Sequence, residues 1–252
     1  MSRRASSPLD NVHLPIAFEP IYLPVCDSAR AQAVSRARAG APEGTLVWAG
    51  AQQAAQARVA EWHSPDGGLY CALILRADLP AHRLAELVPV ATVALGTAIA
   101  EQVAAMAELR YRWPNSVYIN AARIAGVWLD TGSDWQVLAC GVNVEQSPRG
   151  DFDCACLREE GGVPDLDVKG LLAGYTRQLL AGLTRWDEEG PASALHHLRS
   201  RAQRPGDLLT LRLPDGGALS GEFAAIADDG ALELETEAGM QRIAMERYLG
   251  VG

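Results

Sequence analysis

Lysine is nearly absent from this chain. Lys169 is the only lysine, so arginine supplies the other 21 of the 22 basic residues. Acidic residues number 31 and set the formal net charge at −9. An acidic chain is not attracted to the phosphate backbone of nucleic acid or to an anionic membrane surface. We therefore expect neither nucleic acid nor a membrane among its partners.

Cysteines are too few and too unevenly spaced for a disulfide framework. The chain has five, an odd number, and no two are separated by the two-residue spacer of zinc and redox motifs. Reduced thiols are expected at Cys26, Cys71, Cys140, Cys154 and Cys156.

Targeting and membrane-spanning patterns are missing as well. The longest apolar run, residues 88–100, is interrupted by Pro89 and Gly96 and is too short to cross a bilayer. Residues 3 and 4 are arginines, but the polar residues after them form no apolar signal-peptide core. These features predict a soluble, cytoplasmic protein.

The short motifs of common enzyme classes do not occur either. The sequence has no Walker or dinucleotide-type glycine loop, no HExxH zinc motif and no GxSxG nucleophile elbow. His196 and His197 are neighbours on a predicted helix, where their rings point about 100° apart and suit joint metal ligation poorly. No protein-built metal site is expected.

Hydrophobic periodicity predicts a domain that mixes helices and strands. Apolar residues at three- and four-residue steps indicate a long central helix over 79–109, and other helical patterns cover 27–39, 168–186 and 193–201. Short apolar runs bounded by turn residues indicate strands at 45–49, 68–76, 117–119, 126–129 and 135–144.

The pattern changes near residue 205. From residue 207 onward, short alternating runs are separated by turns at 214–217 and 228–230, which is typical of a small β-barrel. This region has nine acidic residues against three arginines, a net charge of −6. The predicted organisation is an N-terminal arm at 1–20, a main domain at 21–190, a helical linker at 191–204 and a small β domain at 205–252.

Several blocks of sequence resemble one enzyme family. Residues 112–127 read RWPNSVYINAARIAGV, which is similar to the KWPND…NGxKxAGI block of biotin protein ligases. Three further blocks resemble the family in the same order: APEGT at 41–45, WHSPDGGLY at 62–70 and ACGVNV at 139–144. The acidic β domain resembles the SH3-like domain of many such ligases. The family's DNA-binding helix-turn-helix domain is not expected, since too few residues precede the first block.

The resemblance implies an α+β fold: a mixed sheet flanked by helices, shared by biotin and lipoate ligases, plus a small C-terminal SH3-like β-barrel. It implies that a small acyl acid, biotin or lipoate, is activated as its adenylate with ATP and Mg²⁺. The acyl group then passes to a lysine of a biotinyl or lipoyl carrier domain. A homodimer is also considered as the assembly.

The resemblance further implies roles for individual residues. Arg123 stands at the family's catalytic lysine and Arg112 at the lysine that opens KWPND, so both are expected to hold the carboxylate and the α-phosphate. The implied substrate-binding residues are Ser28, Gln52, Arg58, Gly68, Tyr70 and Gly126. The implied nucleotide-binding residues are Trp113, Pro114, Asn115, Gly141 and Asn143.

The sequence departs from the family where the chemistry needs charge. Residues 54–61 read AAQARVAE in place of a glycine- and arginine-rich loop, so only Arg58 lands on a family arginine and Glu61 replaces a positive charge. Alanines favour a helix, whereas glycines let backbone N–H groups wrap around an anion. Ser116 replaces the aspartate of KWPND.

Three interpretations remain open. The first is a ligase in which arginines replace lysines, keeping the charge but not the shape of an ammonium. The second is a catalytically degraded relative that binds a ligand or a carrier protein. The third is an acyltransferase that takes a pre-activated donor and uses a thiol, for which Cys71 and Cys140 are the candidates. Ordinary structural roles also stand open: core and turn for Trp113 and Pro114, and a surface ion pair for Arg123.

Overall fold

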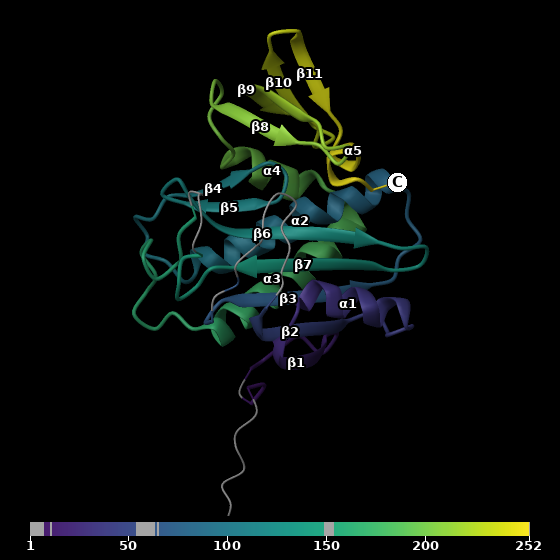
Figure 1. Cartoon of the computed structure of the whole chain (residues 1–252), viewed down its shortest axis with the longest axis vertical. Coiled ribbons are helices and arrows are strands. Elements are labelled where there is room, and N and C mark those ends of the chain that lie inside the picture. Colours follow the sequence, from purple (N-terminus) through teal and green to yellow (C-terminus); the bar gives the residue numbers. More distant parts are fainter. Residues whose placement is uncertain (1–7, 11, 54–63, 65, 149–153, 252) are drawn as a thin grey trace, which may run out of the picture.

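A seven-stranded mixed sheet forms the centre of the computed structural model, which describes residues 8–10, 12–53, 64, 66–148 and 154–251 (Figure 1). The strand order is β1-β2-β3-β7-β6-β5-β4, with β1 and β2 parallel and all other neighbours antiparallel. The strands are β1 (Glu19–Cys26), β2 (Thr45–Gln52), β3 (Leu69–Leu75), β4 (Leu109–Arg112), β5 (Ser116–Ile119), β6 (Ala122–Thr131) and β7 (Gln136–Val142).

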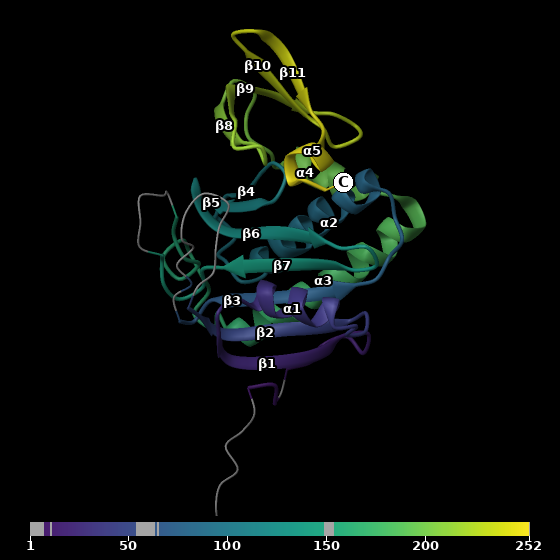
Figure 2. The same ribbon diagram turned by 45° about the vertical axis from the view of Figure 1, so that its right-hand side comes forward.

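Helices cover both faces of the sheet. α1 (Ala29–Arg38) lies over β2, β3 and β7 on one face, and α2 (Ala81–Ala100) and α3 (Val168–Glu189) pack on the other (Figure 2). Side chains alternate between the faces, so Tyr70 packs with α1 while Cys71 joins the larger core under α2 and α3. The predicted mixed sheet with flanking helices is confirmed.

α2 is the central packed helix, but it is shorter than the periodicity predicts. It ends at Ala100, and residues 109–112 form β4 instead of further helical turns. Leu109 pairs with Ile119 across the β4–β5 ladder, so strand pairing overrides the helical spacing. By length and composition α2 could cross a membrane, yet 72% of its most apolar window is buried within the fold. Its apolar surface is therefore core surface.

β1 is the element that periodicity misses. It is an edge strand whose residues are all half-buried or exposed, so the sequence shows no clean alternation there. It begins at Glu19, inside the segment assigned to the arm. β6 also extends well beyond the predicted strand at 126–129, whereas α3 and α4 (Ala192–Ser200) follow the predicted helices closely.

A four-stranded antiparallel sheet of order β11-β10-β9-β8 follows α4 and lies at the top of Figure 1. Its inward side chains, including Phe223 and Leu232, belong to the same buried cluster as α2 and the main sheet. The small β domain and the main domain therefore share one hydrophobic core. Its elements are β8 (Leu208–Arg212), β9 (Ala218–Ile226), β10 (Leu232–Thr236), β11 (Gly239–Ile243) and α5 (Met245–Leu249).

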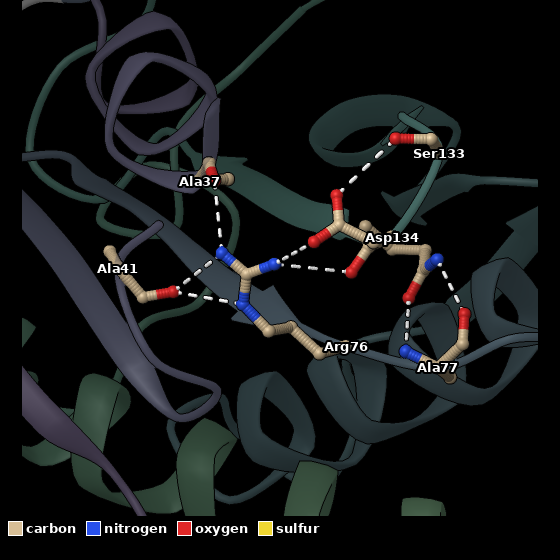
Figure 3. A network of polar contacts seen from close by, with 7 residues as sticks. Ala37, Ala41, Arg76, Ala77, Ser133 and Asp134 are labelled. Atoms are coloured by element: carbon tan, nitrogen blue, oxygen red, sulfur yellow. Dashed lines mark hydrogen bonds and ion pairs between the residues drawn. The ribbon is translucent and has the colours of Figure 1, made fainter. Parts of the chain in front are cut away.

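Arg76 holds the C-terminal end of α1 against the sheet (Figure 3). Its guanidinium donates to the Ala37 carbonyl at 3.0 Å and twice to the Ala41 carbonyl, at 3.0 and 2.9 Å. It also donates to the backbone carbonyl and the carboxylate of Asp134, at 3.2 and 2.6 Å, in the β6–β7 turn. One side chain thus joins α1, β3 and the β6–β7 turn.

Candidate active site

Strand register places five residues that the sequence analysis named in one row across the main sheet, on the face that α1 covers. Tyr70 pairs with Gly141, Gly141 with Gly126, Gly126 with Ser116, and Ser116 with Arg112. Directly opposed residues share a face, so these five side-chain positions line up. We call them the central row. Its middle holds two glycines and a serine, between a tyrosine and an arginine.

Arg123 reaches the central row from the start of β6. A Cβ atom built on Gly126 would lie 2.7 Å from Nη2 of Arg123 and 3.2 Å from Cη2 of Trp128. The absence of a side chain at Gly126 is therefore what lets both groups lie over the row. The Arg123 carbonyl accepts from the Ala155 N–H at 3.1 Å, which fixes the strand on its other side. Arg123 thus reaches the central row, and its implied role in holding the carboxylate and the α-phosphate stays a prediction.

Arg112 provides a second positive charge at the end of the row. Its side chain is exposed and its guanidinium carbon lies 4.5 Å from the centre of the Tyr118 ring. Tyr118 is in turn the β-sheet partner of Arg123. Within the described part of the chain, Arg112 forms no ion pair. Guanidinium groups from two neighbouring strands suit a carboxylate or a phosphate.

Ser28 and Gln52 hold the N-terminal end of α1. Ser28 is the N-cap residue, and its Oγ accepts from the Ala31 N–H at 3.4 Å. Gln52 accepts from the Ala29 N–H at 2.7 Å and donates to Ser64 Oγ at 2.8 Å. Both predicted substrate-binding side chains therefore hydrogen-bond within the protein, and they position the helix end beside the central row.

Tyr70 explains the glycine at position 68. A Cβ atom on Gly68 would lie 2.2 Å from the Tyr70 hydroxyl oxygen, so only glycine leaves room for the ring. Tyr70 is buried, and this burial raises the pKa of its phenol well above the ordinary value despite a hydrogen bond with Ser64. Tyr70 therefore stays protonated at neutral pH, and its uncharged side chain lies at one end of the central row.

One constraint on the site was not found from the sequence. Arg30, in the first turn of α1, forms a bidentate ion pair with Asp130 of β6, with donor–acceptor distances of 2.5 and 2.7 Å. This pair fastens the start of α1 to the strand that carries Gly126 and Arg123. The sequence shows an arginine at 30 and an aspartate at 130, but nothing in the one-dimensional pattern pairs them.

Trp113 lies at the junction with the small β domain. Its indole N–H donates to the Gly230 carbonyl at 2.8 Å, and its ring centre lies 4.8 Å from that of Tyr248 in α5. Pro114 follows it through a cis peptide bond. Both residues are buried, which matches the core and turn roles left open for them, and their implied contact with nucleotide stays a prediction.

Replacing Trp113 with phenylalanine should destabilise the protein by about 2 kcal/mol, because the buried Gly230 carbonyl would lose its donor. Urea unfolding followed by circular dichroism measures this change in the free energy of unfolding. A loss below about 0.5 kcal/mol would mean that the carbonyl finds another donor and that the indole N–H is dispensable.

Asn115 and Asn143 fix the strands around the row. The Asn115 amide donates to the Val127 carbonyl at 2.8 Å, and the fully buried Asn143 amide donates to the Ala155 carbonyl at 3.0 Å. Within the described residues, Oδ1 of Asn143 has no hydrogen-bond partner. That oxygen is an acceptor available to a donor group of a ligand or a water. Any contact of either asparagine with nucleotide stays a prediction.

Other candidates are either outside the described residues or buried away from the row. Arg58, Glu61 and the rest of the segment 54–61 lie outside the described residues. Cys71 and Cys140 are buried on the opposite face of the sheet, and the pKa of Cys71 is raised by its contact with Cys140 and by burial, which disfavours a nucleophilic thiolate. No group of three metal-ligating side chains occurs in the described ranges.

Comparison with known proteins identifies the family of this chain. Residues 14–200 match the model of the biotin/lipoate A/B protein ligase family. The chain belongs to this family. Residues 210–245 match the C-terminal domain of biotin protein ligases, in agreement with the expected SH3-like domain. The family membership confirms the resemblance drawn from the four sequence blocks.

Individual relatives of this family give the same assignment. The chain is 32% identical to a biotin–[acetyl-CoA-carboxylase] ligase of Paracoccus denitrificans, over 75% of this chain and 83% of the relative. A biotin protein ligase from Aquifex aeolicus, solved in complex with biotin and ATP, superposes with a TM-score of 0.75 at 23% identity, covering 90% of this chain and 96% of that one. A biotin protein ligase-like protein of unknown function from Silicibacter sp. TM1040 gives 0.76 at 20% identity, covering 95% and 99%. The last two comparisons show the shared fold.

Proposed function

We propose that this protein is a biotin–protein ligase that works with arginines where its relatives have lysines. The observation that supports this most is the placement of Arg123 and Arg112 at the central row, on the positions of the two family lysines. The Paracoccus relative, a biotin–[acetyl-CoA-carboxylase] ligase, supports biotin as the acid and a biotinyl carrier domain as the acceptor.

The chemistry has two steps that both develop negative charge. In the first, a carboxylate oxygen of biotin attacks the α-phosphorus of ATP, the bond to the bridging oxygen breaks, and pyrophosphate leaves. In the second, the ε-amine of the carrier lysine attacks the acyl carbon, AMP leaves, and the amine loses a proton. Fixed positive charge next to the carboxylate and the α-phosphate lowers the barrier of the first step.

Arg123 and Arg112 can supply that charge. A guanidinium stays protonated at every physiological pH and can donate hydrogen bonds to two oxygens at once. Arg123 would hold the carboxylate and α-phosphate over Gly126, and the exposed Arg112 would approach the outer phosphates. Mg²⁺ in such a site is usually held by substrate phosphates, water and one or two carboxylates, and no group of three metal-ligating side chains occurs in the described ranges.

Binding without adenylation is the second candidate function. It is favoured by the two side chains expected to line the acyl pocket, Ser28 and Gln52, which are both engaged with α1. The alanine-rich sequence at 54–61 also supports it. A thioester-dependent transferase has less support, because the two candidate thiols are buried behind the sheet.

Calorimetric titration and pyrophosphate release together test these alternatives. The protein would be titrated with biotin, lipoate and octanoate, each with and without ATP and Mg²⁺. The ligase proposal predicts micromolar binding of biotin and ATP-dependent pyrophosphate release, followed by labelling of a carrier domain. Binding without pyrophosphate release would favour the second candidate, and preference for lipoate would reassign the acid. If no acid binds, with or without ATP, the ligase proposal is overturned and binding of a carrier protein is left as the candidate function.

Replacing Gly126 with alanine should weaken biotin binding by about tenfold or more. The added methyl would push the guanidinium of Arg123 out of place, and small misplacements in an active site are costly. Calorimetry measures the change in Kd. Gly174→Ala is the matched control, because a Cβ there meets only ordinary contacts of 3.5 Å on α3. Equal affinities of the two variants would show that binding does not need the Arg123 guanidinium in this position over Gly126.

A further inference from the structure

Two cysteines face each other at the middle of the main sheet. Cys71 of β3 and Cys140 of β7 are direct partners in the antiparallel ladder, and their Sγ atoms lie 3.3 Å apart. Neither residue belongs to the central row, because both point to the opposite face. Each side chain is almost fully buried. The proposed ligase chemistry makes no use of them.

The backbone geometry of such a pair suits a disulfide. Opposed residues in an antiparallel pair have Cα atoms about 4.5–5.5 Å apart, which is within the range of about 4.4–6.8 Å found for disulfides. Bond formation needs the sulfur atoms to approach from 3.3 Å to about 2 Å. Side-chain rotation and a small approach of the two strands supply a shift of that size.

The surroundings slow this chemistry and then protect its product. One thiol donates to the other, and this contact together with burial raises the pKa of Cys71 well above its usual value. The phenol of Tyr175 in α3, itself fully buried, lies close to both thiols, and burial together with their proximity raises its pKa well above the ordinary value. A thiolate therefore forms only when β3 and β7 separate locally, and once the strands close again a bridge is shielded from reductants.

We propose that Cys71 and Cys140 form a modification site that hydrogen peroxide converts to a disulfide linking β3 to β7. One thiolate attacks a peroxide oxygen, the O–O bond breaks, and the leaving hydroxide takes up the proton released from that thiol, so that a sulfenic acid and water form. The second thiol attacks that sulfur, the S–OH bond breaks, and a second water carries away the proton. Two thiols are oxidised and one peroxide is reduced to two waters, so atoms and electrons balance.

The bridge lies directly beneath the central row. Cys71 follows Tyr70 and Cys140 precedes Gly141, and those neighbours are themselves partners in the ladder on the other face. Drawing the two sulfurs together changes the spacing of Tyr70 and Gly141. Oxidation of the two buried cysteines therefore changes the central row through the strands that they share, and no oxidant has to enter the active site.

Non-reducing peptide mapping tests the proposal on the whole chain. The reduced protein is exposed to hydrogen peroxide for hours, alkylated and digested with trypsin. Because the chain is cut almost only after arginine, Cys71 lies in residues 59–76 and Cys140 in residues 124–149, and neither peptide contains another cysteine. The expected product is the linked pair of these two peptides, which dithiothreitol separates again.

Thermal unfolding provides the second measurement. The bridge closes a long loop, so the oxidised protein should have a Tm higher by about 5 °C, and dithiothreitol should remove the increase. Cys71→Ala and Cys140→Ala should each abolish the linked peptide and the Tm rise, while Cys26→Ala should keep both. Free or singly oxidised thiols after peroxide, or a linked peptide that appears only in urea, would overturn the proposal. These readouts do not depend on biotin, so they stand apart from the test of the ligase activity.

Discussion

Replacing Arg123 with alanine should lower kcat/KM for biotin-dependent pyrophosphate release by about 10²–10³-fold. A group that stabilises developing negative charge is typically worth that factor when it is removed from an active site. Arg123 lies over Gly126 in the central row, and β6 and the Ala155 hydrogen bond hold it there. The measurement is steady-state pyrophosphate release at several biotin concentrations, so that kcat and KM are separated.

Arg123→Lys provides the informative comparison. Lysine stands at this position in the family motif, so the variant should keep activity within about tenfold of the parent, with the loss in kcat because an ammonium lacks the two-pronged geometry. Arg177→Ala is the matched control, since that arginine is an exposed residue of α3 paired with Glu101. If Arg123→Ala retained activity within threefold of the parent, the charge must come from another residue and the proposed mechanism would be wrong.

Replacing Arg76 with alanine should lower the free energy of unfolding by about 2 kcal/mol. The variant would remove both donors to the Ala41 carbonyl and the donors to Asp134, and a part-buried carbonyl left without a donor costs about 1 kcal/mol or more. The Ala37 carbonyl loses one hydrogen bond but keeps that from the Gly40 N–H at 3.1 Å. The Arg76 side chain is only 24% exposed, so water replaces these bonds incompletely. Urea unfolding monitored by circular dichroism gives the difference.

Asp134→Ala separates the parts of this network. Asp134 has a side chain that is 71% exposed, so its ion pair with Arg76 should be worth less than about 1 kcal/mol. Most of the loss in Arg76→Ala should therefore come from the carbonyls at and just after the end of α1. Equal losses in the two variants would assign the effect to the ion pair instead, and no loss in either would mean that α1 is held by its buried alanines alone.

Sequence reasoning recovered the helices and strands whose signals are local. Periodicity located α2, α3 and α4, and alternation with turns located the small β domain. It failed at the end of α2, where Leu109 continues the helical spacing yet pairs with Ile119 in a strand. It failed again at β1, because an edge strand that is exposed on one side leaves no apolar pattern.

The candidate site was accessible from sequence as a set of residues but not as an arrangement. Family motifs pointed to Arg112, Arg123, Gly126 and Gly141, which strand register then brings to one row or its border. The pairing of Arg30 with Asp130 spans 100 positions, and no local rule predicts it. Likewise, the indole of Trp113 is directed to the small β domain, a contact that depends on how two domains pack.

Because the two domains share one core, Trp113 links the position of the small β domain to that of the central row. Arg112, the last residue of the central row, is its immediate neighbour in the chain, and the Trp113 side chain contacts both the Gly230 carbonyl and the Tyr248 ring. Asn115, on the other side of Pro114, is bonded to β6. The small β domain therefore cannot rotate as an independent module. A tilt of its sheet would displace the short rigid segment that contains Trp113. This segment also carries Arg112, one of the two positive charges that the proposed chemistry requires.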